Sequence, residues 1–207
     1  MRSTAKCSHG AGQIPGAIYN SEVPNATVRR FTAAFASAIL LCASLGAQPR
    51  EILIIRHAEK PVGPIDPNLT QRGYQRAAAL VRLFPTSFDP PDYLFASKIS
   101  KHSNRCVETL TPLASALHMR LNSNIPDEGY AYLARDILTN RQYAGKMLIV
   151  CWHHGKIPAL AKALGVSNPP KPWPETVFDR VWRIRFSQSG ATLDNLPQHL
   201  LPGDSPE

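Results

Sequence analysis

The chain has few cysteines, and no two of them have the short spacing of a zinc finger. Four cysteines occur in 207 residues. Two of them, Cys106 and Cys151, fall in predicted apolar segments, so we interpret both as small core residues rather than as a disulfide or a nucleophile. A glycine-rich nucleotide loop and internal repeats are also missing. These absences remove the commonest sequence signals of metal, nucleotide and repeat proteins.

The chain also lacks a basic run of about five to eight residues, which nucleic-acid-binding segments commonly contain. Its net charge is +8, but the surplus cations are scattered. A scattered surplus favours small anionic substrates over nucleic acid. The sequence leaves the oligomeric state open.

An apolar stretch, residues 31–45, follows Arg29-Arg30 and leads to a small-residue exit near Ala47. It resembles a secretory signal and, at about fifteen residues, is short for a membrane span. We expect residues 1–48 to be a signal-like or disordered segment and residues 49–207 to form a single domain. The protein is then exported, periplasmic or secreted, if residues 1–47 act as a signal, and cytoplasmic otherwise. No stable membrane insertion of the mature domain is expected.

Three predicted strands end in cationic or histidine-containing clusters. Residues 52–55 form an aliphatic run typical of a strand buried on both faces of a parallel sheet, and Arg56-His57 follows at once. The strand at residues 92–97 precedes the cations that end in Arg105, and the strand at residues 146–152 precedes His153-His154. Ligands of such sheets bind at the carboxyl ends of strands. Guanidinium groups match phosphoryl oxygens, and a histidine among them can act as a nucleophile.

Helical patterns separate these strands. Thr70 is a plausible N-cap of the first helix, and further helices are expected at residues 103–118, 130–138 and 157–164. A last strand is expected at residues 178–186. We expect the polar tail after Gly190 to be loose.

Four motifs then follow one another in a fixed order: Arg56-His57, Leu69-Thr70-x-x-Gly73-x-x-x-Ala77, Arg105 with Glu108-Thr109, and His153 after a strand. Over residues 51–165 this set resembles the histidine phosphatase superfamily, the phosphoglycerate mutase-like and histidine acid phosphatase-like enzymes. The resemblance implies an α/β fold, a three-layer α/β/α sandwich around a mostly parallel sheet. It implies no metal ion and no organic cofactor.

The resemblance also implies a role for each matching residue. His57 corresponds to the nucleophile that becomes phosphorylated, Arg56 and Arg105 to the arginines that clamp the phosphate, and His153 to the second histidine at the phosphoryl group. The implied activity is metal-independent hydrolysis of a small phosphomonoester through a phosphohistidine on His57. Two more cations, Lys60 and Arg72, are candidates for extending the substrate-binding surface.

The proton donor stays open. His154 occupies the place where the family usually has glycine or an acid, and the spacing to Ile157 favours His153 over His154 as the phosphate contact. A mutase-type glutamate motif is missing between Arg105 and His153, which leaves Asp127, Glu128 and, less readily, Glu59. The first two are equally readable as first-turn acids of a helix.

Three alternatives to the hydrolase remain. One is a non-catalytic phosphate-binding or regulatory domain of the same fold, and another is a phosphoglycerate mutase-type phosphotransferase. The third is a metal site built from His57, His153, His154 and Glu59, against which the neighbouring arginines argue because cations repel a metal ion.

Overall fold

A computed structural model describes residues 48–63 and 66–205. The predicted signal segment, residues 1–47, lies outside the described residues. All described residues belong to one compact unit.

A six-stranded sheet with the order β3-β2-β4-β1-β5-β6 forms the centre of this unit. Strands β1, β2, β3 and β4 run parallel, and β5 and β6 are antiparallel additions on the β1 side. The mostly parallel sheet expected from the sequence is therefore confirmed. The strands span Glu51–Arg56, Tyr93–Ala96, Leu121–Asn122, Met147–Trp152, Arg180–Ser187 and Gly190–Pro197, for β1 to β6 respectively.

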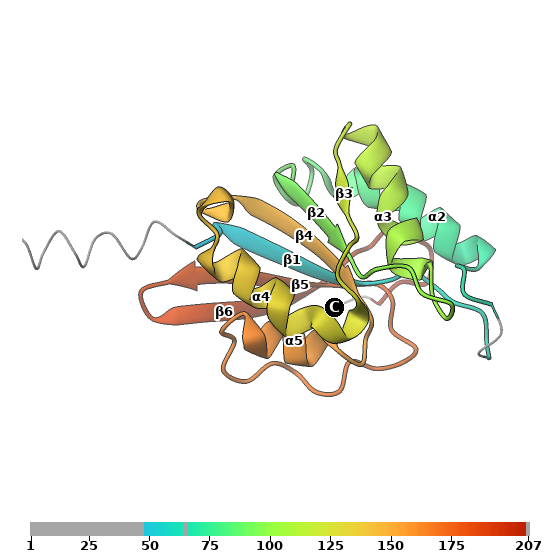
Figure 1. Ribbon diagram of the computed structural model, residues 1–207. Helices are drawn as coiled ribbons and strands as arrows, with labels where there is room; N and C mark the ends of the chain where they lie inside the picture. Colours follow the sequence, from blue (N-terminus) through green and yellow to red (C-terminus); the bar gives the residue numbers. More distant parts are fainter. Residues whose placement is uncertain (1–47, 64–65, 206–207) are drawn as a thin grey trace, which may run out of the picture. The chain divides into compact units, whose positions relative to one another are not determined.

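Helices cover both faces of the sheet, as Figure 1 shows. Ile52 and Ile54 of β1 pack into a core that contains residues of α4 and α5, whereas Leu53 and Ile55 pack into a second core with α3. This alternation follows from the two-residue period of a strand and makes β1 apolar on both faces. The three-layer α/β/α prediction is thus confirmed. The helices are α2 Gln71–Ala79, α3 Arg105–Ala116, α4 Tyr130–Thr139 and α5 Ile157–Ala163, with short 3₁₀ turns at Leu80–Leu83, Asp127–Gly129 and Arg141–Tyr143.

The start of α2 is held close to the chain that leaves β1. Thr70 is the N-cap, as predicted, and its hydroxyl accepts a hydrogen bond from the Gly73 amide. A Cβ at Gly73 would lie 2.4 Å from the Glu59 carbonyl oxygen, so only glycine permits this approach. The close packing fixes the segment that carries Arg56 and His57 against α2.

The prediction of a loose tail after Gly190 was wrong. Gly190–Pro197 forms β6, which pairs with β5 along its whole length. Beyond it, Leu200 is buried and Asp204 pairs with Arg76 of α2. The tail is ordered by partners that are distant in the sequence, so its polar composition carried no local signal of this order.

Candidate active site

Arg56 and His57 lie at the carboxyl end of β1, beside the end of the parallel neighbour β4. The His57 amide donates to the Trp152 carbonyl, and the imidazole is 1% exposed. Its Nδ1 lies 2.7 Å from the Ala58 carbonyl oxygen. Because a carbonyl oxygen only accepts, we assign the hydrogen to Nδ1. This tautomer leaves a lone pair on Nε2.

The environment of His57 keeps the imidazole neutral. Burial lowers its pKa most, and the bond to the Ala58 carbonyl opposes this effect. Positive charge on Arg56, His153 and Arg105 lowers the pKa further, to about 2. A neutral imidazole keeps its nucleophilic lone pair throughout the physiological pH range.

His153 faces His57 from the end of β4. The two ring centroids are 5.4 Å apart with an interplanar angle of 63°. His153 Nδ1 lies 2.9 Å from the Asp127 carboxylate, and its Nε2 lies 2.9 Å from the Ser103 hydroxyl. The structure therefore brings together two of the predicted histidines and one of the predicted acids.

His153 differs from His57 in its protonation. Burial lowers the pKa of His153, but the neighbouring Cys106 sulfur and the Asp127 carboxylate raise it more, to about 10. Nδ1 then donates to Asp127, and Nε2 also carries a hydrogen. One site thus holds a neutral and a protonated imidazole side by side.

Two arginines beside these rings each have at least one buried nitrogen without a hydrogen-bond partner in the described part of the chain. Arg56 is 1% exposed, and its Nη1 donates to the carbonyls of Pro174, Glu175 and Val177. Its buried Nε and Nη2 have no partner within the described part of the chain, and neither does the buried Nε of Arg105. Burial lowers the pKa of both arginines, that of Arg56 to about 10. Such orphaned donors fit a bound anion.

The other predicted acid–base residues have different surroundings. Glu128 is mostly exposed and pairs with Lys156 at 2.7 Å. His154 is half-buried, and burial followed by the charge on Arg56 lowers its pKa. The negative charge on Glu175 raises the pKa of His154, and the positive charge on Lys60 lowers it. The charge on Arg56 therefore acts on His154, whereas Asp127 binds His153.

Two of the predicted cations are already paired with carboxylates. Lys60 lies 3.1 Å from Glu175, which joins the segment after β1 to the loop before β5. Arg72 bonds to Glu59 and to the Pro202 carbonyl. Arg72 therefore anchors the C-terminal segment, which provides no support for the predicted substrate contact.

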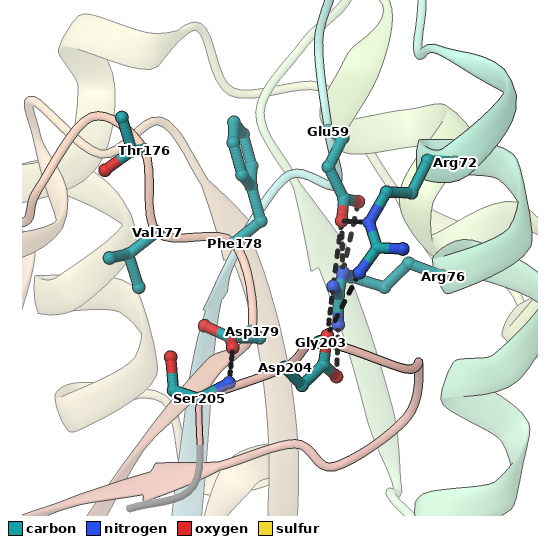
Figure 2. A pocket seen from close by; sticks show the side chains of 10 residues that line it. All are labelled: Glu59, Arg72, Arg76, Thr176, Val177, Phe178, Asp179, Gly203, Asp204 and Ser205. Carbon is teal, nitrogen blue, oxygen red and sulfur yellow. Dashed lines mark hydrogen bonds and ion pairs between the residues drawn. The ribbon is translucent and has the colours of Figure 1, made fainter.

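Glu59 belongs to the same anchoring network rather than to the histidines. Its carboxylate binds Arg76, a residue only 3% exposed that also binds Asp204. Figure 2 shows these groups together on one side of a cavity of about 310 Å³, with Val177 and Phe178 on the other. Within residues 48–63 and 66–205, no group of three or more His, Cys, Asp or Glu side chains has metal-binding geometry.

Sequence reasoning missed Ser103 and Phe178. Ser103 is 7% exposed and bonds to His153, and the Phe178 ring lies 3.9 Å from Arg56 Cζ and 6.0 Å from the His57 ring. Neither residue type carries a local signal. Only the position of Ser103 two residues before Arg105 could have drawn attention to it.

Among the described residues, no helix is both long and apolar enough to cross a membrane.

Comparison with known proteins identifies the architecture. Neither a family model nor a curated protein sequence matches the chain. Among solved structures, Entamoeba histolytica phosphoserine phosphatase in complex with 3-phosphoglyceric acid is 17% identical, with a TM-score of 0.53 over 73% of this chain and 99% of that chain. The mycobacterial glucosyl-3-phosphoglycerate phosphatase with inorganic phosphate is 15% identical, with a TM-score of 0.50 over 70% and 95%.

The protein histidine phosphatase SixA complexed with tungstate is likewise 15% identical, with a TM-score of 0.50 over 72% of this chain and 97% of that chain. All three belong to the superfamily that the sequence motifs resemble. The chain therefore has the histidine phosphatase, or phosphoglycerate mutase-like, fold.

Proposed function

We propose that the protein is a metal-independent phosphomonoester hydrolase that forms a phosphohistidine on His57. One observation carries the proposal: a buried neutral imidazole with a lone pair on Nε2 lies near three buried guanidinium nitrogens that have no partner among the described residues. The structural neighbours are phosphatases by name, which supports the same class of activity.

Phosphate binding would satisfy the orphaned donors. A buried donor without a partner costs about 1–3 kcal/mol, and hydrogen bonds to an anion are the strong class. Arg56 supplies Nε and Nη2, and Arg105 supplies Nε. The positive charge on Arg105 repels that on Arg56 and contributes to the lowered pKa of Arg56. A dianionic phosphoryl group would relieve this repulsion. The same donors would neutralise charge on the equatorial oxygens of the transition state.

In the first chemical step, His57 Nε2 attacks phosphorus and the bond from phosphorus to the ester oxygen breaks. His57 Nδ1 keeps its hydrogen on the Ala58 carbonyl, which fixes the ring. The leaving alkoxide takes a proton from His153 Nε2, in place of the hydrogen bond that this nitrogen makes to the Ser103 hydroxyl. In the second step, water attacks the phosphohistidine, neutral His153 takes a proton from the water, and the phosphorus–nitrogen bond breaks to release inorganic phosphate.

His153 is the best-placed proton donor among the predicted residues. It is the one with a raised pKa, about 10, so it carries a proton at neutral pH. Asp127 and Glu128 each accept from a cation, His153 and Lys156 respectively, which makes them acceptors rather than donors. His154 has a lowered pKa. Asp127 is then a positioning residue that holds the His153 ring and its charge.

The test is hydrolysis of alkyl phosphomonoesters, with and without a chelator, by the wild type and the His57→Ala variant. We expect chelator-insensitive turnover that falls by about 10⁴-fold or more in His57→Ala, because the nucleophile is lost. Wild-type protein quenched in acid should contain a base-stable phosphohistidine. His102→Ala, at an exposed histidine of a neighbouring loop, is the matched control and should keep full activity.

Two results would reject the proposal. His57→Ala could retain wild-type turnover with an unchanged thermal unfolding midpoint. Alternatively, the wild type could bind vanadate tightly yet hydrolyse no ester and form no phosphoenzyme, which is the behaviour of a non-catalytic phosphate-binding domain.

A further inference from the structure

A cavity of about 460 Å³ lies between the segment that leaves β1 and the loop that precedes β5. Pro61 and Val62 line one wall, and Thr176 and Phe178 line the other. The volume lies within the range of about 300–1,000 Å³ that small-molecule sites occupy. Thr176 and Phe178 also line the cavity beside the ion-pair network of Glu59 and Arg76.

The cavity adjoins the candidate phosphate site through Phe178. Phe178 is the shared wall, because its ring lies 3.9 Å from Arg56 Cζ and 6.0 Å from the His57 ring. Arg56 also holds the wall that contains Thr176 and Phe178, because it donates hydrogen bonds to the carbonyls of residues 174, 175 and 177. The organic part of an ester whose phosphate binds Arg56 would therefore have this cavity within reach.

The lining of the cavity consists of apolar and uncharged residues and of one pair of opposite charges. Val62 is fully exposed, so a ligand in the cavity would remove an aliphatic side chain from water. Lys60 and Glu175 are the charged residues of the lining, and they pair with each other at 3.1 Å. No net charge remains to attract a carboxylate or a second phosphate. An apolar group would cover the Val62 side chain and the part of Phe178 that Arg56 leaves uncovered.

We propose that this cavity binds the organic part of the substrate, and that the substrate is the monophosphate ester of a neutral, largely apolar alcohol at least as large as one aromatic ring. This inference rests on the proposed function, since it assumes that the phosphate occupies the Arg56 site. It assigns Val62 and Phe178 to substrate selection.

Binding of phosphonates to the wild-type protein, measured by calorimetry, tests the inference without requiring turnover. Benzylphosphonate and methylphosphonate carry the same charged group and differ by one aromatic ring. We expect benzylphosphonate to bind at least about tenfold more tightly, the discrimination typical of an apolar pocket for an added apolar group. Kinetics with benzyl phosphate and O-phosphoserine should show the same preference in kcat/KM.

Val62→Asn removes apolar surface without adding charge and, at an exposed position, leaves the fold intact. It should lower the ratio of the two phosphonate affinities by about fourfold or more, the equivalent of one buried methylene group. Tyr132→Asn, at another exposed apolar residue on α4, is the matched control and should leave the ratio unchanged.

Equal affinity for the two phosphonates would overturn the inference, as would a ratio that Val62→Asn does not change. These outcomes differ from a failure of the proposed function. If phosphonates discriminate as expected but no ester is hydrolysed, the cavity stands as a binding site and the hydrolase is rejected. If all esters are hydrolysed with equal kcat/KM, the hydrolase stands and the apolar selectivity is rejected.

Discussion

Replacing Asp127 with asparagine should separate the orientation of His153 from its charge. The side chain keeps its shape, but the partner of His153 Nδ1 becomes neutral. Asp127 Oδ1 lies 2.9 Å from Nδ1, and the His153 side chain is 20% exposed, so solvent screens the pair only in part. Hydrogen bonds to charged groups contribute about 1.5–3 kcal/mol. At 1.36 kcal/mol per pKa unit, we expect the His153 pKa to fall by about one to two units.

The direction of the pH effect follows from the raised pKa of His153, about 10 against an ordinary value of 6.5. Protonated His153 stabilises the fold fully below pH 6.5, and this contribution is lost as the pH rises through about 10. Asp127→Asn should therefore flatten the alkaline decline in stability. If His153 is the proton donor, the alkaline limb of kcat/KM should move to lower pH by the same one to two units.

The assay is kcat/KM for an alkyl phosphate from about pH 5 to about pH 11, together with an NMR titration of the His153 ring. An alkyl leaving group needs a proton more than a nitrophenolate does, so the variant should lose more activity with the alkyl ester. Glu128→Gln, at the adjacent exposed acid, is the control and should leave the profile unchanged. An alkaline limb that does not move in Asp127→Asn, or a wild-type His153 that titrates near 6.5, would refute the reasoning.

Two predictions concern stability. Arg76→Ala breaks a buried ion-pair network and should lower the free energy of unfolding by about 3–5 kcal/mol. Arg72→Ala removes a half-exposed arginine that also bonds to Glu59 and should lower it by less than about 1 kcal/mol. Similar urea midpoints for the two variants would contradict this. Gly73→Ala places a Cβ 2.4 Å from a backbone oxygen and should destabilise the protein by about 1–3 kcal/mol. Gly155→Ala, with open space around it, should change the thermal midpoint little. Equal midpoints for the two variants would show that α2 can shift freely.

The strand ends were the most predictable part of the molecule. An aliphatic run specifies a strand buried on both faces through composition alone, and the residue after it is then placed at the edge where ligands bind. The sequence therefore placed Arg56 and His57 at that edge. The same reasoning brought His153 to the neighbouring strand end, which the parallel pairing of β1 and β4 confirms. The Thr70 cap was readable for a similar reason, because capping is a local interaction.

The distribution of charged partners was decided by the tertiary structure alone. Asp127 and Glu128 are adjacent acids with the same local signal, yet one bonds to His153 and the other to Lys156 at the surface. Glu59 lies two residues after His57 but is bound by Arg76, whose other carboxylate partner, Asp204, comes from a tail with no local pattern of order. Residue type and spacing determined which chemistry the chain carries. Which acid meets which base depended on contacts between distant segments, because only folding brings those charges within hydrogen-bonding distance.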